Sequence, residues 1–216
     1  ENKTNPKEAE MTAALVIAAS EQPEYEGATM GVISLVGEEQ ARRIGEMLLR
    51  YMNPQEYERH RLVCGNPAQF QGDERDVMFL SMVDGPGDGP LALRRQDTFK
   101  QRFNVAASRA RDQMWLVHSL NPTTDLKAGD LRRRLIEYVR DPGAFSRAVD
   151  VASRRGESQF EKDVIRDLMA EGFRVTSQVE VGYYRIDMVV DDGHNRVAVE
   201  CDGDRYHPLE KLPEDM

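Results

Sequence analysis

Two acidic residues near the C-terminus, Asp187 and Glu200, have the chemistry and spacing needed to hold a metal ion. They lie in two β-branched runs separated by Asp, Gly and Asn, a pattern that predicts a β-hairpin. With Gly193–His194 as the tight loop, Asp187 faces Glu200 on the neighbouring strand. Carboxylates that face each other across a strand pair are about 5 Å apart at Cβ and repel. A cation or a shared proton stabilises such a pair, so the hairpin predicts a divalent-metal site.

Strand alternation divides this hairpin into two faces. Asp187 and Glu200 share one face with Arg185, Asp202 and apolar Val and Ala residues. That mixture predicts half-burial, where unpaired charge is costly. The side chain of Cys201 points to the other face, so we expect it in the core. The alternative is a solvated acidic hairpin, an interpretation that best fits Asp191, Asp192 and Asp204.

The composition is that of a globular protein. The chain has 216 residues, 40% hydrophobic and 31% charged, enough for one large domain or two small ones. Its longest apolar run is too short to cross a bilayer, no secretory leader begins the chain, and two cysteines make no disulfide framework, so we expect a cytoplasmic protein. The net charge of −9 opposes nucleic-acid binding by the whole surface but permits a local basic track. Because the chain begins with Glu, we expect it to be a piece of a longer protein.

In the first part of the chain, short apolar runs typical of buried strands alternate with segments whose apolar residues recur at helical spacing. This pattern predicts an α/β fold with a parallel sheet and flanking helices. The helix expected at 130–140 is followed by Asp141-Pro142-Gly143, and we expect a linker from there to Gly156. A smaller α+β unit then follows, with a helix at 158–171, a strand at 174–181 and the hairpin. We expect domains at residues 1–125 and 156–216, with a helix and linker at 126–155. In the first unit the expected strands are 30–36, 61–64, 76–83 and 113–119, and the other expected helices are 6–20, 38–52 and 96–111.

Polar residues recur in the first unit where a fold alone does not need them. The stretch 69–76, Gln-Phe-Gln-Gly-Asp-Glu-Arg-Asp, precedes a buried strand, and ligands bind at strand ends in α/β sheets. The stretch 104–111 ends with Arg109 and Arg111, and a planar guanidinium suits a phosphate. Gln40 opens the helix after the first strand. Each feature alone also fits a solvated helix end or a surface loop.

In this order, the stretches resemble motifs IV, V and VI of the second RecA-like domain of superfamily 1 helicases, in the Upf-like branch that includes nonsense-decay and DNA-replication helicases. The resemblance covers roughly the first 120 residues. It implies that Arg109 reaches the γ-phosphate of ATP as an arginine finger. It also implies that Gln71 couples the nucleotide to a nucleic-acid track. The nucleotide-site residues implied are Gln40, Gln71, Gly72, Glu74, Arg109 and Arg111.

No G-x-x-x-x-G-K-[ST] motif occurs in the sequence, and no Asp-Glu pair follows a strand as in a Walker B motif. In the family these residues belong to the first RecA-like domain. We therefore expect ATP to bind only together with such a domain, and we expect this polypeptide alone not to hydrolyse ATP.

The second unit resembles the PD-(D/E)XK nucleases, and within them the very-short-patch-repair type. The resemblance implies that Asp187 and Glu200 bind Mg²⁺ or Mn²⁺, with the Cys201 carbonyl as a further ligand and Glu161 completing the acidic cluster. The family lysine falls at position 202, which is Asp. Either Asp202 is an extra ligand or base, or Arg185 or His207 replaces the lysine. Because the fold of this type continues beyond the hairpin, we expect the nuclease unit to be incomplete at Met216.

The leading hypothesis is part of an ATP-dependent helicase or translocase with a C-terminal metal-dependent DNA endonuclease domain. We expect DNA as the nucleic-acid partner, with RNA left open. The alternative is a degenerate nuclease fold that only binds nucleic acid or a protein partner. A small-molecule α/β enzyme needs a glycine-rich phosphate loop after the first strand, where the sequence has only Gly37.

Overall fold

The computed structural model describes residues 3–88, 91–154, 156, 158–181, 184–193 and 195–201, with the backbone alone at 88 and 184. The chain divides into two compact units, Glu1–Arg140 and Asp141–Met216. Each unit is described by itself. None of the helices in the described ranges has the length and apolar character needed to span a bilayer.

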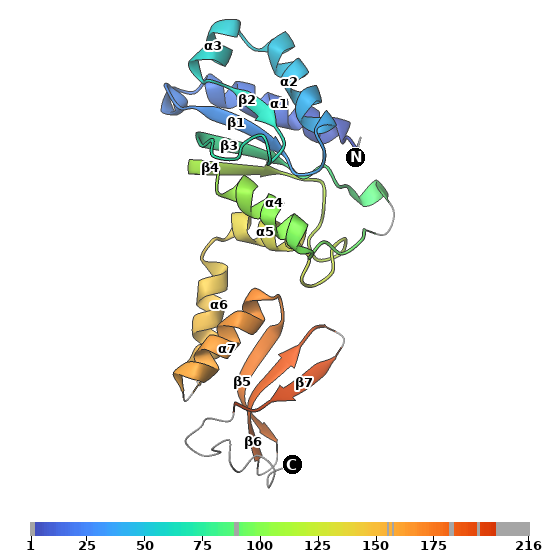
Figure 1. The fold of residues 1–216 in the computed structure, drawn as a ribbon, viewed down its shortest axis with the longest axis vertical. Helices are drawn as coiled ribbons and strands as arrows, with labels where there is room; N and C mark the ends of the chain where they lie inside the picture. The colour runs from blue at the N-terminus through green and yellow to red at the C-terminus, as the bar shows by residue number, and fades with distance from the viewer. Residues whose placement is uncertain are drawn as a thin grey trace. The chain divides into compact units, whose positions relative to one another are not determined.

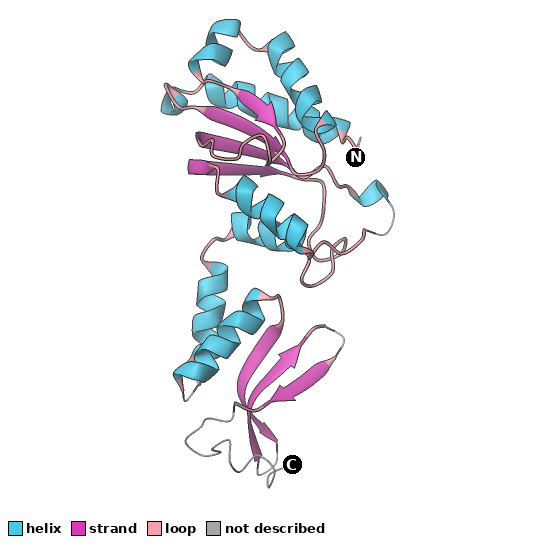
Figure 2. Cartoon of the chain, viewed as in Figure 1, coloured by secondary structure: helices cyan, strands magenta, loops and turns pink. Residues whose placement is uncertain are grey.

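The first unit is a parallel sheet between two layers of helices (Figures 1 and 2). Its four strands are hydrogen-bonded in the order β2-β1-β3-β4. Its strands are β1 (Met30–Ser34), β2 (Val63–Gly65), β3 (Arg75–Ser81) and β4 (Ala110–Val117). Its helices are α1 (Pro6–Ser20), α2 (Glu39–Tyr51), α3 (Pro54–Arg59), α4 (Asp97–Ala107) and α5 (Leu131–Arg140), with 3-10 turns η1 (Pro23–Tyr25) and η2 (Pro86–Asp88).

Alternation along the central strands builds a core on each face of the sheet. Val77 and Phe79 of β3 pack with α1 and α2, whereas Met78 and Leu80 pack with α4 and α5. β1 and the later part of β3 are mostly apolar because both faces of the sheet are covered there. Cys64 of β2 packs on the first of these cores, and burial raises the pKa of its thiol to about 12.

The helix expected at 96–111 and the strand expected at 113–119 need correction. Helix α4 ends at Ala107, and β4 already begins at Ala110, so Arg109 lies in the turn between them and Arg111 lies on the strand. Ala and Arg favour helix locally. Parallel pairing with β3 overrides that preference, since Arg75 N–H donates to Arg109 O at 2.9 Å and Arg75 faces Ala110.

The second unit consists of two helices and an antiparallel sheet. The helices are α6 (Ala144–Ser153) and α7 (Gln159–Ala170), and the strands β5 (Arg174–Val181), β6 (Tyr184–Asp191) and β7 (Arg196–Val199) are ordered β5-β6-β7. Ile165 of α7 packs on Met188 and Val190 of β6 to form the core. The predicted fold class, a parallel α/β unit followed by a small α+β unit, is confirmed.

The stretch expected to be a linker from Asp141 to Gly156 contains helix α6. The prediction that a helix stops before Asp141 is correct, because α5 ends at Arg140. Helix α6 belongs to the second unit and packs on its sheet. The Ser177 hydroxyl on β5 donates to the Ala152 carbonyl, and Ala152 contacts the core. The helix was not predicted because Pro142 and Gly143 precede it and indicate a break. Packing against α7 and β5 stabilises it.

The predicted hairpin register is correct over the part that is paired. Asp191 faces Arg196, and the ladder continues to Met188 facing Val199. Asp192 N–H donates to Asn195 O at 3.2 Å and closes the turn, with Gly193 at φ +95°. A positive φ is cheap for glycine, so the turn can be this tight.

Candidate functional site

The turn before β3 and the turn before β4 lie side by side at the amino ends of these strands. Their adjacency follows from the backbone hydrogen bond that joins Arg75 to Arg109. The structure therefore brings together the predicted residues Glu74, Arg109 and Arg111 at this edge, and Gln71 and Gly72 belong to the turn that leads into β3. This edge is opposite to the carboxyl edge at which ligands usually bind in open α/β sheets.

Charged side chains pair across this edge. The Arg111 guanidinium lies 3.5 Å from a Glu74 carboxylate oxygen and 3.5 Å from an Asp76 carboxylate oxygen. Asp76 also accepts 2.7 Å hydrogen bonds from the Thr29 N–H and hydroxyl, and these bonds lower the pKa of its carboxyl. The amino edge thus holds one arginine fixed between two acids.

Arg109 folds back on its own helix. Its Nε donates to Val105 O at 3.0 Å, and its terminal nitrogen donates to the Ser108 hydroxyl at 2.7 Å. Both partners are neutral oxygen acceptors at the end of α4. A phosphate oxygen could replace them as the acceptor for Arg109, and no buried charged group would lose its partner. Nearby Gly72 has φ +82° and open space around its Cα, which leaves its backbone accessible.

Gln40 lies at the opposite, carboxyl edge of the sheet. Its side chain is fully buried: the carbonyl oxygen accepts from Asn5 N–H at 2.9 Å, and the amide donates to Asn5 O at 3.1 Å and Ser81 Oγ at 3.0 Å. These bonds tie the start of α1 to the end of β3. The structure does not bring Gln40 together with the other predicted nucleotide residues.

In the second unit, Asp187 lies where pairing between β6 and β7 ends. The register that joins Met188 to Val199 would next place Asp187 opposite Glu200, but β7 stops at Val199. The Asp187 carboxylate instead accepts a 2.8 Å hydrogen bond from the Cys201 N–H. Asp187 is half-buried and Glu200 is exposed, while the Cys201 side chain contacts the core, as predicted.

Glu161 has a local structural partner. It is buried and forms a capping box at the start of α7: its carboxylate accepts from Ser158 N–H at 3.2 Å, and Ser158 Oγ accepts from Glu161 N–H at 3.1 Å. Asp202 and His207 lie outside the described residues. Within the described part of the chain, no three His, Cys, Asp or Glu residues gather closely enough to hold a metal ion. The three-acid cluster expected from Glu161, Asp187 and Glu200 is not formed there.

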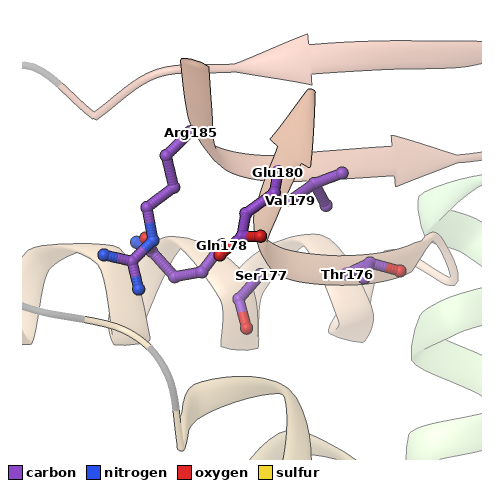
Figure 3. Close-up of a pocket in the computed structure, with 6 residues that line it drawn as sticks. All are labelled: Thr176, Ser177, Gln178, Val179, Glu180 and Arg185. Atoms are coloured by element: carbon purple, nitrogen blue, oxygen red, sulfur yellow. The ribbon is translucent and has the colours of Figure 1, made fainter. Parts of the chain in front are cut away.

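The structure adds a residue that sequence reasoning missed, Gln178 on β5. Its side chain is 5% exposed, and its amide donates to the second Glu161 carboxylate oxygen at 3.3 Å. Together with Arg185 it lines a cavity of about 610 Å³ along β5 and β6 (Figure 3). The available signal was the pair Ser177-Gln178, two consecutive polar residues inside a strand.

The oxygen atoms of Asp187 on β6 and of the segment just after β7 are of the kind that a hard divalent cation prefers. Asp187 and Glu200 supply carboxylates, and Cys201 supplies a backbone carbonyl next to the N–H that Asp187 binds. Mg²⁺ is commonly held by one or two carboxylates, with water and substrate phosphate completing its shell. Two acids are therefore sufficient, and the capping role of Glu161 does not exclude binding.

Two family models match the chain. A model described as an AAA domain, AAA_12, matches residues 1–121, more than half of the 216. It is helicase-like and corresponds to the second RecA-like domain of the superfamily 1 branch. The restriction-endonuclease-like REase_MTES_1575 model matches residues 160–216. No curated protein matches the chain.

Proposed function

The chain belongs to the AAA_12 family of helicase-like AAA domains and carries a restriction-endonuclease-like domain after it, and on that premise we propose that it serves an ATP-dependent helicase or translocase that also cuts DNA. The observation that carries the proposal is the pairing of two phosphate-chemistry sites in one chain. The amino edge of β3 and β4 presents guanidinium groups, and the point where pairing between β6 and β7 ends presents carboxylates.

At the amino edge, this chain supplies half of an ATP site. Arg109 releases its bonds to Val105 and Ser108 and donates to the γ-phosphate, where charge develops during transfer. Arg111 stays between Glu74 and Asp76 and keeps the edge in shape. Gly72 offers backbone N–H groups, Gln71 links this turn to the nucleic acid, and Gln40 holds the opposite edge. A first RecA-like domain supplies the Walker motifs.

Where pairing between β6 and β7 ends, Asp187, Glu200 and the Cys201 carbonyl would hold Mg²⁺ or Mn²⁺. When bound, the cation lowers the pKa of a water molecule and neutralises charge on the scissile phosphate. Asp187 fixes the position of Cys201 through its hydrogen bond, so one side chain orients two of the three ligands. Asp202 is proposed as an additional acid, and Arg185 as the cation that stands in for the family lysine. DNA is the proposed substrate, and the cytoplasm the proposed compartment.

Plasmid nicking tests the nuclease. We expect a protein with the complete nuclease unit to convert supercoiled DNA to the open circular form with Mg²⁺ or Mn²⁺ but not with EDTA, and Asp187→Ala to lose this conversion. Asp167→Ala removes a charge from the exposed face of α7 and serves as the matched control. Metal-independent nicking, or nicking that Asp187→Ala retains, would contradict the proposal. Uncut plasmid with a complete, folded nuclease unit would also overturn it.

ATP hydrolysis tests the helicase half. We expect no hydrolysis by the chain alone, and nucleic-acid-stimulated hydrolysis when a first RecA-like domain is joined to it. Arg109→Ala should reduce that rate by about a thousandfold, the usual contribution of an arginine finger. Arg95→Ala, at an exposed position before α4, is the control. A rate that Arg109→Ala leaves unchanged would remove Arg109 from the site.

The second candidate function is binding without cleavage. It is favoured by Asp202 in place of a lysine and by the engagement of Glu161 in a helix cap. Fluorescence anisotropy with labelled DNA and RNA separates the two functions. A chain that binds either one in EDTA, with the same affinity after Asp187→Ala, and never nicks it would be a binding module.

A further inference from the structure

Helices α6 and α7 both pack on one face of the second unit's sheet. Val175, Met188 and Val199, one from each strand, contact Ile165 or its neighbours in the core on that face. Because side chains alternate along a strand, the residues between them point the other way. We call this second side the open face, since no helix of the unit covers it in the part of the chain that the structure describes. Its residues include Arg174, Thr176, Asp187, Val189, Asp191, Arg196 and Ala198.

Three charged residues form a row across the open face, beside the hairpin turn. Arg174 on β5 faces Asp191 on β6, and Asp191 faces Arg196 on β7. A terminal nitrogen of Arg174 lies 3.8 Å, and Nε of Arg196 3.3 Å, from the Asp191 carboxylate oxygens. Asp191 also accepts a 2.6 Å hydrogen bond from the Gly193 N–H, which lowers the pKa of its carboxyl and keeps it charged. The row thus has two cations around one anion.

Most hydrogen-bond donors of this row are unused. A guanidinium has five N–H groups. Within the described ranges, Arg196 donates to Asp191 through Nε, and Arg174 approaches the same carboxylate at 3.8 Å, beyond hydrogen-bond distance. The two side chains are 75% and 79% exposed. Exposed guanidinium groups with free terminal nitrogens suit the oxygens of a phosphate, which they can bind in pairs.

The strand geometry relates this row to Asp187, the proposed nuclease acid on the same face. Asp187 lies four residues from Asp191 along β6, a distance of about 13 Å at about 3.3 Å per residue. The row between them consists of the small side chains Thr176, Val189 and Ala198. Phosphates of a DNA duplex strand advance about 3.4 Å along the helix axis. A duplex that lies along β6 would therefore have about four phosphate intervals between the charged row and Asp187.

From this arrangement we infer that Arg174 and Arg196, oriented by Asp191, form a docking site for the phosphate backbone of duplex DNA. The inference rests on the proposed nuclease function, which makes DNA the partner. Because the chain has a net charge of −9, most of its surface repels DNA, and a local cationic row favours approach by the face that carries it. The row orients the duplex and gives no sequence preference, since all sequences share the backbone.

The double substitution Arg174→Gln/Arg196→Gln tests the site. We measure binding of labelled duplex DNA by fluorescence anisotropy in EDTA at a series of salt concentrations. We expect affinity to fall about tenfold, and the slope of log affinity against log salt to become shallower by about one to two. Arg174→Lys/Arg196→Lys keeps both charges, so its slope should be that of wild type. Arg147→Gln/Arg166→Gln, at two exposed, ion-paired arginines of α6 and α7, is the charge-matched control.

Asp191→Asn should change binding in the opposite direction. It keeps an oxygen for the Gly193 N–H but removes the one negative charge of the row, so we expect tighter DNA binding and a steeper salt slope. Asp163→Asn removes the ion-pair partner of Arg166 on α7 and should change binding little. The thermal midpoint of each variant in EDTA is the folding control, and we expect little change because exposed ion pairs contribute little to stability.

The outcomes separate the docking site from the nuclease function. A Gln double variant with an unchanged midpoint and an unchanged slope overturns the docking site, as do equal effects in the α6 and α7 controls. If that variant has a lowered midpoint, wild-type DNA affinity in both the Lys double variant and Asp191→Asn overturns it.

Plasmid nicking by a protein with the complete nuclease unit supplies the other comparison. Nicking that requires Asp187 and is unaffected by Arg174→Gln/Arg196→Gln overturns the docking site and leaves the nuclease function intact. Binding that depends on the two arginines, without nicking under any metal condition, overturns the nuclease function and supports the docking site.

Discussion

The Asp187 carboxylate accepts a 2.8 Å hydrogen bond from the backbone N–H of Cys201, the residue that follows Glu200. This bond fixes the chain just beyond β7, where the strand pairing has ended. Asp187 therefore has two separable roles, one as an acceptor and one as a charge. A substitution that keeps the acceptor and removes the charge distinguishes them.

Asp187→Asn is that substitution. Its side-chain oxygen still accepts from Cys201, so we expect an unchanged thermal midpoint in EDTA. Because a neutral amide is a poor ligand for a hard cation, we expect Mn²⁺ affinity to fall at least about tenfold. Calorimetry measures the affinity, with Asp167→Asn as the charge-matched control. An equal loss of affinity in both variants would point to net charge and not to a site.

Arg132 on α5 is the centre of a buried ionic cluster in the first unit. It donates to Asp84 at 2.7 Å, to Asp130 at 2.7 and 2.9 Å, and to Ala92 O at 2.7 Å. Arg132→Met leaves two buried acids without this partner, so we expect a loss of about 3–5 kcal/mol in the free energy of unfolding. Urea denaturation measures it.

The neighbouring Arg133 provides the control for that experiment. It is partly exposed and pairs with Glu137 at 2.8 Å, a surface pair on one helix. Arg133→Met should cost less than about 1 kcal/mol. Equal losses at the two positions would show that the buried cluster contributes no more than a surface ion pair.

Glu8 on α1 is buried among donors. One carboxylate oxygen accepts from Asn5 Nδ2 and Ser119 Oγ, and the other from Ser81 Oγ and Val83 N–H. In Glu8→Gln either orientation of the amide places its NH₂ against an N–H donor. We expect a loss of about 1–3 kcal/mol in urea denaturation. Glu10→Gln, exposed on the same helix, should change stability little.

Glu8 and Asp76 should give pH dependences of opposite sign. Burial raises the pKa of Glu8, so the folded state binds its proton more tightly, and stability falls as pH rises from 4.5 through the folded pKa. Hydrogen bonds from Thr29 lower the pKa of Asp76, so its stabilisation is present above pH 3.8 and is lost as pH falls through the lower folded pKa.

Asp76→Asn isolates the second of these effects. The stability difference between wild type and Asp76→Asn should be constant above pH 5 and shrink as pH falls below 3.8, in urea titrations at each pH. Asp112→Asn, exposed on β4, should show no such change. A difference that grows at low pH would reverse the assigned direction.

The sheet and the hairpin were predictable because their strands have a clear hydrophobic pattern and their turns have polar and glycine residues. The central strands are apolar on both faces, and the Asp-Gly-His-Asn turn sets the register that places Met188 opposite Val199. The role of Glu161 was also available, since Ser158-Gln-Phe-Glu161 has the spacing of a capping box. Only its consequence was missed: a carboxylate used in a cap is not free to join an acidic cluster.

Other features depend on tertiary contacts that residue types do not encode. Arg111 lies on a strand because β3 pairs with its segment, although the local sequence favours helix. Gln40 lies at the carboxyl edge of the sheet, away from the other predicted nucleotide residues, because its amide is bonded to Asn5 and Ser81. Gln178 has φ +53° inside β5 and contacts Glu161, and sequence spacing reveals neither feature.

The burial of Cys64 makes its thiol a weak nucleophile at neutral pH. With a pKa of about 12, the Cys64 thiol is almost entirely protonated at neutral pH, and the thiolate is the reactive form. Maleimide or iodoacetamide chemistry at neutral pH is thus directed away from β2, leaving Cys201 as the other target in the sequence. Because the Cys201 side chain contacts the core, a fluorophore attached there would test the proposed cation site only in a protein whose thermal midpoint labelling leaves unchanged.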